Sequence, residues 1–172
     1  YLVKKVVFNI NILPLVKTIA ALFIHVFFIL FMLLLFALYG YYPGFHTLMV
    51  VYFSLSLMIF VTGVCMMTSA LVVFFRDLSQ IINIFLQVGI WMTPIMWNIN
   101  DMKARIPEAV MVILKCNPLY YIVMGYRESF IDKVWFWEHP GMTLYFWGFT
   151  ALTCLFGVMV FKRLKVHFAD VL

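Results

Sequence analysis

The chain has 172 residues, of which 66% are hydrophobic and only 11% are charged, and its formal net charge is +5 at pH 7. Soluble domains are usually about half apolar with about a quarter of their residues charged, so a soluble domain of this length could not hide so much apolar surface. The Lys and Arg residues stand at the ends of apolar segments and form no basic stripe of the kind that binds nucleic acid. Lipid is therefore the expected solvent.

The first part of the chain predicts a surface helix followed by two spans. Residues 1–14 carry Val and Ile at helical spacing, with Lys and Asn between them, which favours a helix lying on the membrane. Predicted spans follow at residues 15–39 and 47–75, and no Asp, Glu, Lys or Arg occurs between Lys17 and Arg76. An apolar run of about 20 residues can cross a bilayer as a helix, so this interval holds two spans.

The third predicted span covers residues 80–97. Its polar residues Gln80, Asn83 and Gln87 are spaced three and four apart, which places them on one helix face. Because polar side chains are costly against lipid, this face is expected to meet protein or water. Two interpretations stay open. A hydrogen-bonded seam between helices is favoured, and the lining of a pore is the alternative.

Residues 98–141 hold ten charged residues, five of each sign, around two short apolar pieces at 106–114 and 119–125. As helices these pieces would rise only about 10–14 Å each, well short of the roughly 30 Å hydrocarbon core. A Pro lies near the start of each piece, where it suits the first turn of a helix. The region therefore predicts a hairpin of two short helices that dips into the membrane from one side.

The last predicted span, residues 142–161, leads into a basic tail. Four spans place both ends of the chain on one side of the membrane, where seven Lys or Arg residues lie in short segments. The other side has five Lys or Arg residues, and five Asp or Glu residues balance their charge. The positive-inside rule then places both ends in the cytoplasm and the hairpin region outside.

Motifs for catalysis are missing from the sequence. It has no G-x-x-x-x-G-K-[ST] motif, so ATP binding by a P-loop of its own is not expected. The four His residues lie far apart and the three Cys residues form no CxxC pair, so neither a metal site nor a disulfide framework is predicted. A membrane-embedded transferase acting on lipid-linked sugars is an alternative, and its carboxylates would come from Asp101, Glu108, Glu128, Asp132 and Glu138. These acids have no recognisable catalytic spacing, so the chain is not predicted to be an enzyme.

Five local signatures occur in order: "YLVKKVVFNINILP", "FFRDLSQI", "TPIMW", "NPLYYIVMGYRESFI" and "FKRLKVHFADVL". This order resembles the membrane subunit of polysaccharide-exporting ABC transporters. With "WFWEHPGMTLYFW" after the fourth signature, the chain is most similar to the teichoic-acid translocation permeases of Gram-positive bacteria. The resemblance covers nearly all of the chain. It implies an all-α polytopic membrane protein of a family with six spans, of which the first two are expected to precede this single permease domain.

The resemblance also implies a function and partners. It indicates a multi-pass permease of the bacterial plasma membrane that forms a homodimer and works with two separate ABC ATPase subunits. The pair would act as a flippase for lipid-linked wall teichoic acid, an anionic glycopolymer used in cell wall biogenesis. ATP and Mg²⁺ would be bound by the ATPase, and no cofactor by this chain. Capsule, O-antigen or a drug is the alternative cargo.

The resemblance assigns contacts with the ATPase to two segments. Lys4, Lys5 and Phe8 lie in the segment that matches the family's coupling helix. Arg76 and Asp77 match the next cytoplasmic turn.

The translocation path and outer gate are expected at Trp91, Trp97, Tyr120, Tyr121 and Arg127. Aromatic faces stack well on sugar rings, although an aromatic belt at the membrane interface gives the same pattern. Arg127 could guide phosphate or pair with Glu128 or Asp132, and the ion pair is favoured because charges in this region balance. The hairpin is a gate if it moves and a structural plug if it does not.

Overall fold

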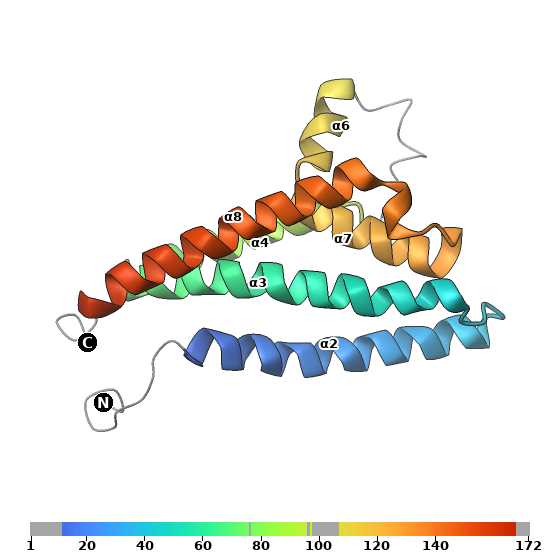
Figure 1. Ribbon diagram of the computed structural model, residues 1–172, viewed down its shortest axis with the longest axis horizontal. Coiled ribbons are helices and arrows are strands. Elements are labelled where there is room, and N and C mark those ends of the chain that lie inside the picture. The colour runs from blue at the N-terminus through green and yellow to red at the C-terminus, as the bar shows by residue number, and fades with distance from the viewer. Residues whose placement is uncertain (1–11, 76, 96, 98–106, 168–172) are drawn as a thin grey trace.

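The computed structural model describes residues 12–75, 77–95, 97 and 107–167. Three long helices run alongside one another (Figure 1): α2 (Ile12–Leu38), α3 (Met49–Phe74) and α8 (Pro140–Leu164). The shorter helices are η1 (Phe45–Leu48), α4 (Leu78–Met92), α6 (Glu108–Lys115), α7 (Pro118–Arg127), the π-helical turn η2 (Glu128–Asp132), η3 (Phe136–Glu138) and η4 (Lys165–His167). No strand occurs among the described residues. The predicted all-α, polytopic fold is confirmed.

Three helical segments are long and apolar enough to cross a membrane: Ile12–Leu38, Phe45–Phe74 and Pro140–Leu164. The pair formed by α6 and α7–η2 would add a fourth if it were one broken span, but it bends by 88°. Such a bend suits the predicted hairpin that enters the membrane and returns.

Helix α4 is shorter than the predicted span at 80–97. Its 15 residues rise about 22 Å, less than the hydrocarbon core of roughly 30 Å. The helix ends at Met92 because Thr93, with ψ 132, is extended. The residue before a proline is disfavoured in the helical region, and Pro94 follows.

The two ends of the bundle differ in what they carry. At one end, here called the terminal end, the last turn of α3 packs against that of α8 through Ala70 and Phe161, and α2 begins there (Figure 1). At the other, the hairpin end, η1 contacts η2 and η3 packs against α8. Helix α2 therefore begins at the end of the bundle where α8 ends, and the placement of both ends of the chain in the cytoplasm stays a prediction.

Helices α3 and α8 cross closely because glycines remove side chains from the contact. A Cβ placed on Gly157 would collide with the carbonyl oxygen of Gly63. A Cβ on Gly63 would lie 2.8 Å from Cys154 Sγ, and this thiol donates to the Ile59 carbonyl at 3.6 Å. Between apolar helices in lipid no hydrophobic force favours association, so close packing of this kind has to supply it.

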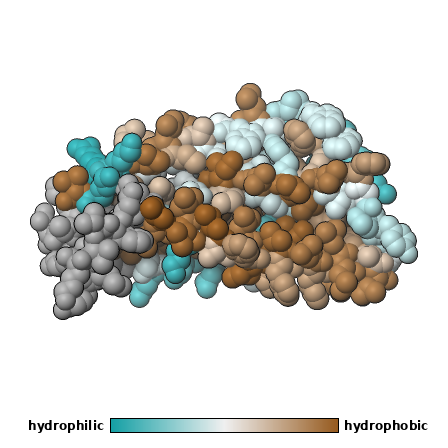
Figure 2. Space-filling view, turned by 60° about the horizontal axis from the view of Figure 1, so that its bottom comes forward, coloured by the Kyte–Doolittle hydropathy of each residue, from teal (hydrophilic) through white to brown (hydrophobic). Residues whose placement is uncertain are grey.

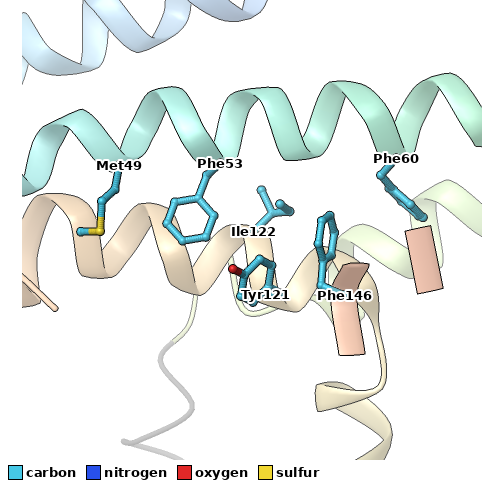
Figure 3. Packing of buried hydrophobic residues seen from close by; sticks show 6 residues of the cluster. All are labelled: Met49, Phe53, Phe60, Tyr121, Ile122 and Phe146. Carbon is cyan, nitrogen blue, oxygen red and sulfur yellow. The ribbon is translucent and has the colours of Figure 1, made fainter. Parts of the chain in front are cut away.

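The main core lies where α7 enters the groove between α3 and α8. Six buried side chains form it (Figure 3): Met49, Phe53, Phe60, Tyr121, Ile122 and Phe146. Gly125 of α7 faces the Phe53 ring, and a Cβ at this position would overlap that ring. The fit places α7 inside the bundle rather than on its surface.

Helix α2 is bound less tightly than α3 and α8. Its only buried residues are Pro14 and Thr18, and Thr18 Oγ1 donates to the Pro14 carbonyl at 3.0 Å. Hydrophobic side chains cover most of the face shown in Figure 2. Such a surface suits contact with lipid or with further helices.

Candidate functional site

The bent helix pair is attached to the end of α4 through Asn117. Its Oδ1 caps α7 by accepting from the Leu119 N–H at 3.0 Å. Its Nδ2 donates to Thr93 Oγ1 at 2.9 Å, and Thr93 Oγ1 in turn donates to the Gly89 carbonyl at 2.7 Å. One amide side chain therefore starts α7 and joins it to the last turn of α4.

Arg127, at the other end of α7, joins the same two elements. Its Nη2 donates to the Pro94 carbonyl at 3.2 Å and to the Trp97 carbonyl at 3.4 Å. These carbonyls lie just beyond α4, where the helix supplies no further N–H partners. Nη1 is buried and has no hydrogen-bond partner among the described residues.

The favoured ion pair of Arg127 with Glu128 or Asp132 is wrong. Within the described part of the chain the guanidinium forms neither pair, and Glu128 Oε1 lies instead 3.4 Å from His139 Nε2. The physical reason is that the Pro94 and Trp97 carbonyls after α4 lie within reach of Arg127 and accept its hydrogen bonds.

Tyr121 joins α7 to α3 and α8. Its hydroxyl lies 3.2 Å from the Tyr52 hydroxyl and 3.1 Å from Thr143 Oγ1. Trp147 Nε1 donates to the Tyr52 hydroxyl at 2.8 Å. Hydrogen bonds in a low-dielectric interior strengthen one another, so this group of side chains holds the start of α7 in place.

Tyr126 joins α7 to α2 and α3. Its hydroxyl lies 2.7 Å from Ser54 Oγ and 2.9 Å from His25 Nε2. Ser54 Oγ donates its single proton to the Val50 carbonyl at 2.6 Å, so Tyr126 donates to Ser54 and accepts from His25. We assign the proton of the neutral imidazole to Nε2 from this network.

A cavity of about 240 Å³ lies in the elbow between α6, α7 and the start of α8. Its lining combines tyrosine rings with one lysine: Val112, Lys115, Cys116, Tyr120, Tyr121, Gly141, Met142 and Tyr145. The Tyr145 hydroxyl donates to the Cys116 carbonyl at 2.6 Å and so closes one wall. Aromatic faces and a cation are groups that could hold a sugar ring or a phosphate.

The structure brings four of the five predicted path and gate residues together around α7. Trp97 packs with Leu114 and Tyr120, Arg127 binds the Trp97 carbonyl, and Tyr121 shares the elbow cavity with Tyr120. Both tyrosines are buried, with 4% and 7% of their surface exposed. Trp91 is outside this group, because its side chain on α4 is 77% exposed. The transport roles of all five stay predictions.

The residues expected to contact the ATPase are mostly outside the described part of the chain. This holds for Lys4, Lys5, Phe8 and Arg76. Asp77 is described: it stands before α4 as an exposed residue and makes no capping hydrogen bond with its side chain. Its role also stays a prediction.

The sequence did not single out Ser54, Tyr126, Tyr52 or Thr143 as a site. Polar side chains inside or beside apolar spans were the available signal, since they are costly there unless they find partners. Their partners come from other helices, 69 and 72 positions away for the Tyr52–Tyr121 and Ser54–Tyr126 bonds. Local spacing could not supply these pairs.

For the polar face of α4, both interpretations stay open: a hydrogen-bonded seam between helices and the lining of a pore. The side chains of Gln80, Asn83 and Gln87 are all exposed on this helix. Among the described residues, no group of three or more His, Cys, Asp or Glu could hold a metal ion.

Comparisons with known proteins now identify the family. The profile of the ABC-2 type transporter family matches residues 4–131, about three quarters of the chain. Two Klebsiella pneumoniae proteins, each named O-antigen export system permease protein RfbA, are 32% and 31% identical over 119 residues. Both matches cover 69% of this chain and 43% of the relative, so the chain spans less than half the length of these relatives. With its apolar helices, this integral membrane protein belongs to the ABC-2 type transporter family.

Proposed function

We propose that the full-length protein is the membrane subunit of an ATP-driven ABC exporter that moves a lipid-linked polysaccharide across the bacterial plasma membrane. Family membership and the names of the two relatives support the class of transporter and of cargo. One structural observation carries the mechanism: a helix pair bent by 88° lies in the bundle at one end. This pair is attached to the spans by side chains rather than by a continuous helix.

Wall teichoic acid is the specific cargo that we propose, from the resemblance of the ordered signatures to teichoic-acid permeases. An O-antigen-like polysaccharide is the second candidate, because both relatives carry O-antigen export in their names. The elbow cavity suits either cargo, since it offers the exposed ring of Tyr145 for sugars and Lys115 for phosphate.

The bent pair acts as the outer gate. Hydrogen bonds from Asn117, Tyr121, Tyr126 and Arg127 attach α7 to its neighbours. Hydrogen bonds between helices in membranes contribute about 0.6 kcal/mol each on average, so these bonds together hold α7 by a few kcal/mol, in addition to its packing in the main core. A conformational change of the spans driven by the ATPase can shift an equilibrium of that size.

The orientation of the permease in the membrane is inferred from the positions of its charges, and its subunit composition is inferred from the family. Lys162 and Arg163 lie in the last turn of α8, at the terminal end, which we place in the cytoplasm. Two copies of the permease and two ATPase subunits form the transporter, with residues 1–12 and the turn at Asp77 facing the ATPase.

Purification of the full-length permease from its native membrane in mild detergent tests this proposal. We expect an ABC ATPase to co-purify in stoichiometric amount, and its hydrolysis to respond to added lipid-linked polymer. Comparing lipid-linked teichoic acid with lipid-linked O-antigen separates the two cargoes. If no ATPase co-purifies, the exporter assignment loses its energy source.

Coupling to the ATPase is tested with Lys4→Ala and Phe8→Ala, with Lys17→Ala as the matched control. Lys17 is an exposed lysine at the start of α2 that has no predicted contact. The first two variants should hydrolyse ATP without exporting polymer, while the control exports normally. Normal coupling in all three would remove residues 1–12 from this role.

Crosslinking distinguishes a gate from a plug. The rings of Phe36 in α2 and Phe130 in η2 are stacked, with centroids 5.3 Å apart. In a background without native cysteines, Phe36→Cys and Phe130→Cys can be joined by a short bifunctional reagent. A gate predicts that the crosslink stops export and that cleaving it restores export, while each single variant stays active. Export that continues across the closed crosslink would show a fixed plug.

A further inference from the structure

His25 stands near the middle of the apolar helix α2. It lies about 20 Å along the helix from Ile12, in a helix about 40 Å long. Among residues 19–38 it is the only polar side chain. An ionisable side chain inside a membrane span is costly unless it finds a partner, and such residues often serve a function. The partner of His25 is Tyr126 of α7, whose hydroxyl lies 2.9 Å from His25 Nε2.

This hydrogen bond joins α2 to the bent pair at a point where three helices meet. Tyr126 donates its own proton to Ser54 of α3, because Ser54 uses its proton on the Val50 carbonyl. The Tyr126 oxygen is therefore left to accept from His25. The two rings also meet edge to face, with centroids 6.0 Å apart. Among the described residues, no other side-chain hydrogen bond joins α2 to another helix.

Two cavities lie between α2 and α3. One, of about 200 Å³, lies beside Thr18, Ala21 and His25. The other, of about 480 Å³, lies nearer the hairpin end. Helices α3 and α8, by contrast, approach each other closely at their glycines. A segment with few buried contacts has low local stability, so α2 can shift against α3 at a smaller cost than α3 can shift against α8.

We propose that His25 is a positioning residue of the outer gate, which holds α7 closed through Tyr126 until α2 shifts within these cavities. The inference rests on the proposed function, in which residues 1–12 face the ATPase and the bent pair is the gate. Helix α2 begins at Ile12 and is continuous over 27 residues, so a displacement at its start reaches His25. When this displacement withdraws the donor from Tyr126, the equilibrium of the gate shifts toward the open state.

A static bond between two helices that stay together is the alternative. Such a bond would stabilise the fold without taking part in gating. Its loss would lower the thermal midpoint and leave the closed gate as tight as before. The two roles therefore differ in how well the gate stays closed when no ATP is present.

Leak through the resting transporter measures this directly and does not require export. The full-length permease is assembled with its ATPase in liposomes loaded with carboxyfluorescein, and release of the dye is followed without ATP. His25→Leu removes the donor and should raise the leak about threefold, the change in an equilibrium that about 0.6 kcal/mol produces. His25→Gln should restore a low leak, because its amide N–H can replace the Nε2 donor.

Thr18→Val is the matched control. Thr18 lines the same cavity as His25, but its hydroxyl donates to the Pro14 carbonyl within α2. This variant should leak no more than the unaltered protein. The leak is measured well below the thermal midpoint of every variant, so that unfolded protein does not contribute to it.

Filling the cavity tests the movement of α2. Ala21 lines the cavity of about 200 Å³ and the neighbouring Ala20 does not, although both residues are exposed. Ala21→Leu should lose export while ATP hydrolysis continues, because α2 has less room to shift. Ala20→Leu adds the same side chain away from the cavity and should export normally.

Three results would overturn the role of His25. They are an unchanged leak in His25→Leu, an equal rise of the leak in Thr18→Val, and normal export by Ala21→Leu. None of them bears on the exporter assignment, which depends on export by the unaltered protein and on co-purification of the ATPase. The inference about His25 can therefore fail while the proposed function stands.

Discussion

Replacing Gly125 by alanine tests how α7 is held in the bundle. A Cβ at this position overlaps the ring of Phe53, which is 1% exposed and packed in the main core. Overpacking of this kind costs about 1–3 kcal/mol. The change from Gly to Ala inside a helix returns about 0.5–1 kcal/mol. The expected net loss of stability is therefore about 0–2.5 kcal/mol, with a middle value of about 1 kcal/mol.

The assay is the thermal midpoint of the detergent-solubilised full-length protein, followed by near-ultraviolet circular dichroism or dye binding. A loss of this size lowers the midpoint by roughly 2–4 °C per kcal/mol in a protein of this length. Gly148→Ala is the matched control, since it also lies in a helix and nothing stands within 4 Å of its added Cβ. This control should keep the midpoint or raise it.

A second substitution shows whether the ring is the cause. Phe53→Leu shortens the side chain that the new methyl group meets, so the double variant should lose less stability than the sum of the two single changes. If Gly125→Ala is as stable as Gly148→Ala, α7 does not lie against Phe53 as described. Additive losses in the double variant would likewise refute direct contact.

Asn117→Ala removes the cap of α7 and its bond to α4, and should cost about 0.5–2 kcal/mol of stability. Asn117→Asp keeps the cap, so its thermal midpoint should lie between those of the unaltered protein and Asn117→Ala. Tyr126→Phe leaves His25 without its partner, so it should lower the midpoint by an amount matching about 1 kcal/mol, whereas an unchanged midpoint would show that the bond contributes nothing. Because burial raises the pKa of Glu128, its protonated form stabilises the fold at low pH, and this contribution is lost as the pH rises through the raised pKa. In Glu128→Gln the thermal midpoint should fall less steeply as the pH rises above 4.5, the ordinary pKa of a glutamate carboxyl. An equal fall with pH in the variant and the unaltered protein would contradict this assignment.

The fold class and the order of the elements could be predicted from the sequence because they depend on local composition. A charge-free interval from Thr18 to Phe75 is enough to require helices in lipid, since each helix satisfies its backbone hydrogen bonds internally. The start of α7 was predicted for the same reason, because a proline such as Pro118 suits the first turn of a helix and acts on its immediate neighbours. The end of α4 was missed, although Thr93 before a proline was a local signal for it.

The contacts that attach α7 to its neighbours could not be predicted from the sequence. An ion pair was predicted for Arg127 because the charges in its region balance, yet its guanidinium reaches the Pro94 and Trp97 carbonyls. His25 and Tyr126 are 101 positions apart in the sequence and form a hydrogen bond, and the local sequence of neither segment predicts this contact. The sequence by itself determined which segments are apolar helices and in which order they follow. Only the tertiary structure decided which polar groups pair, because in a low-dielectric bundle a donor takes whichever acceptor the packing of other helices brings within reach.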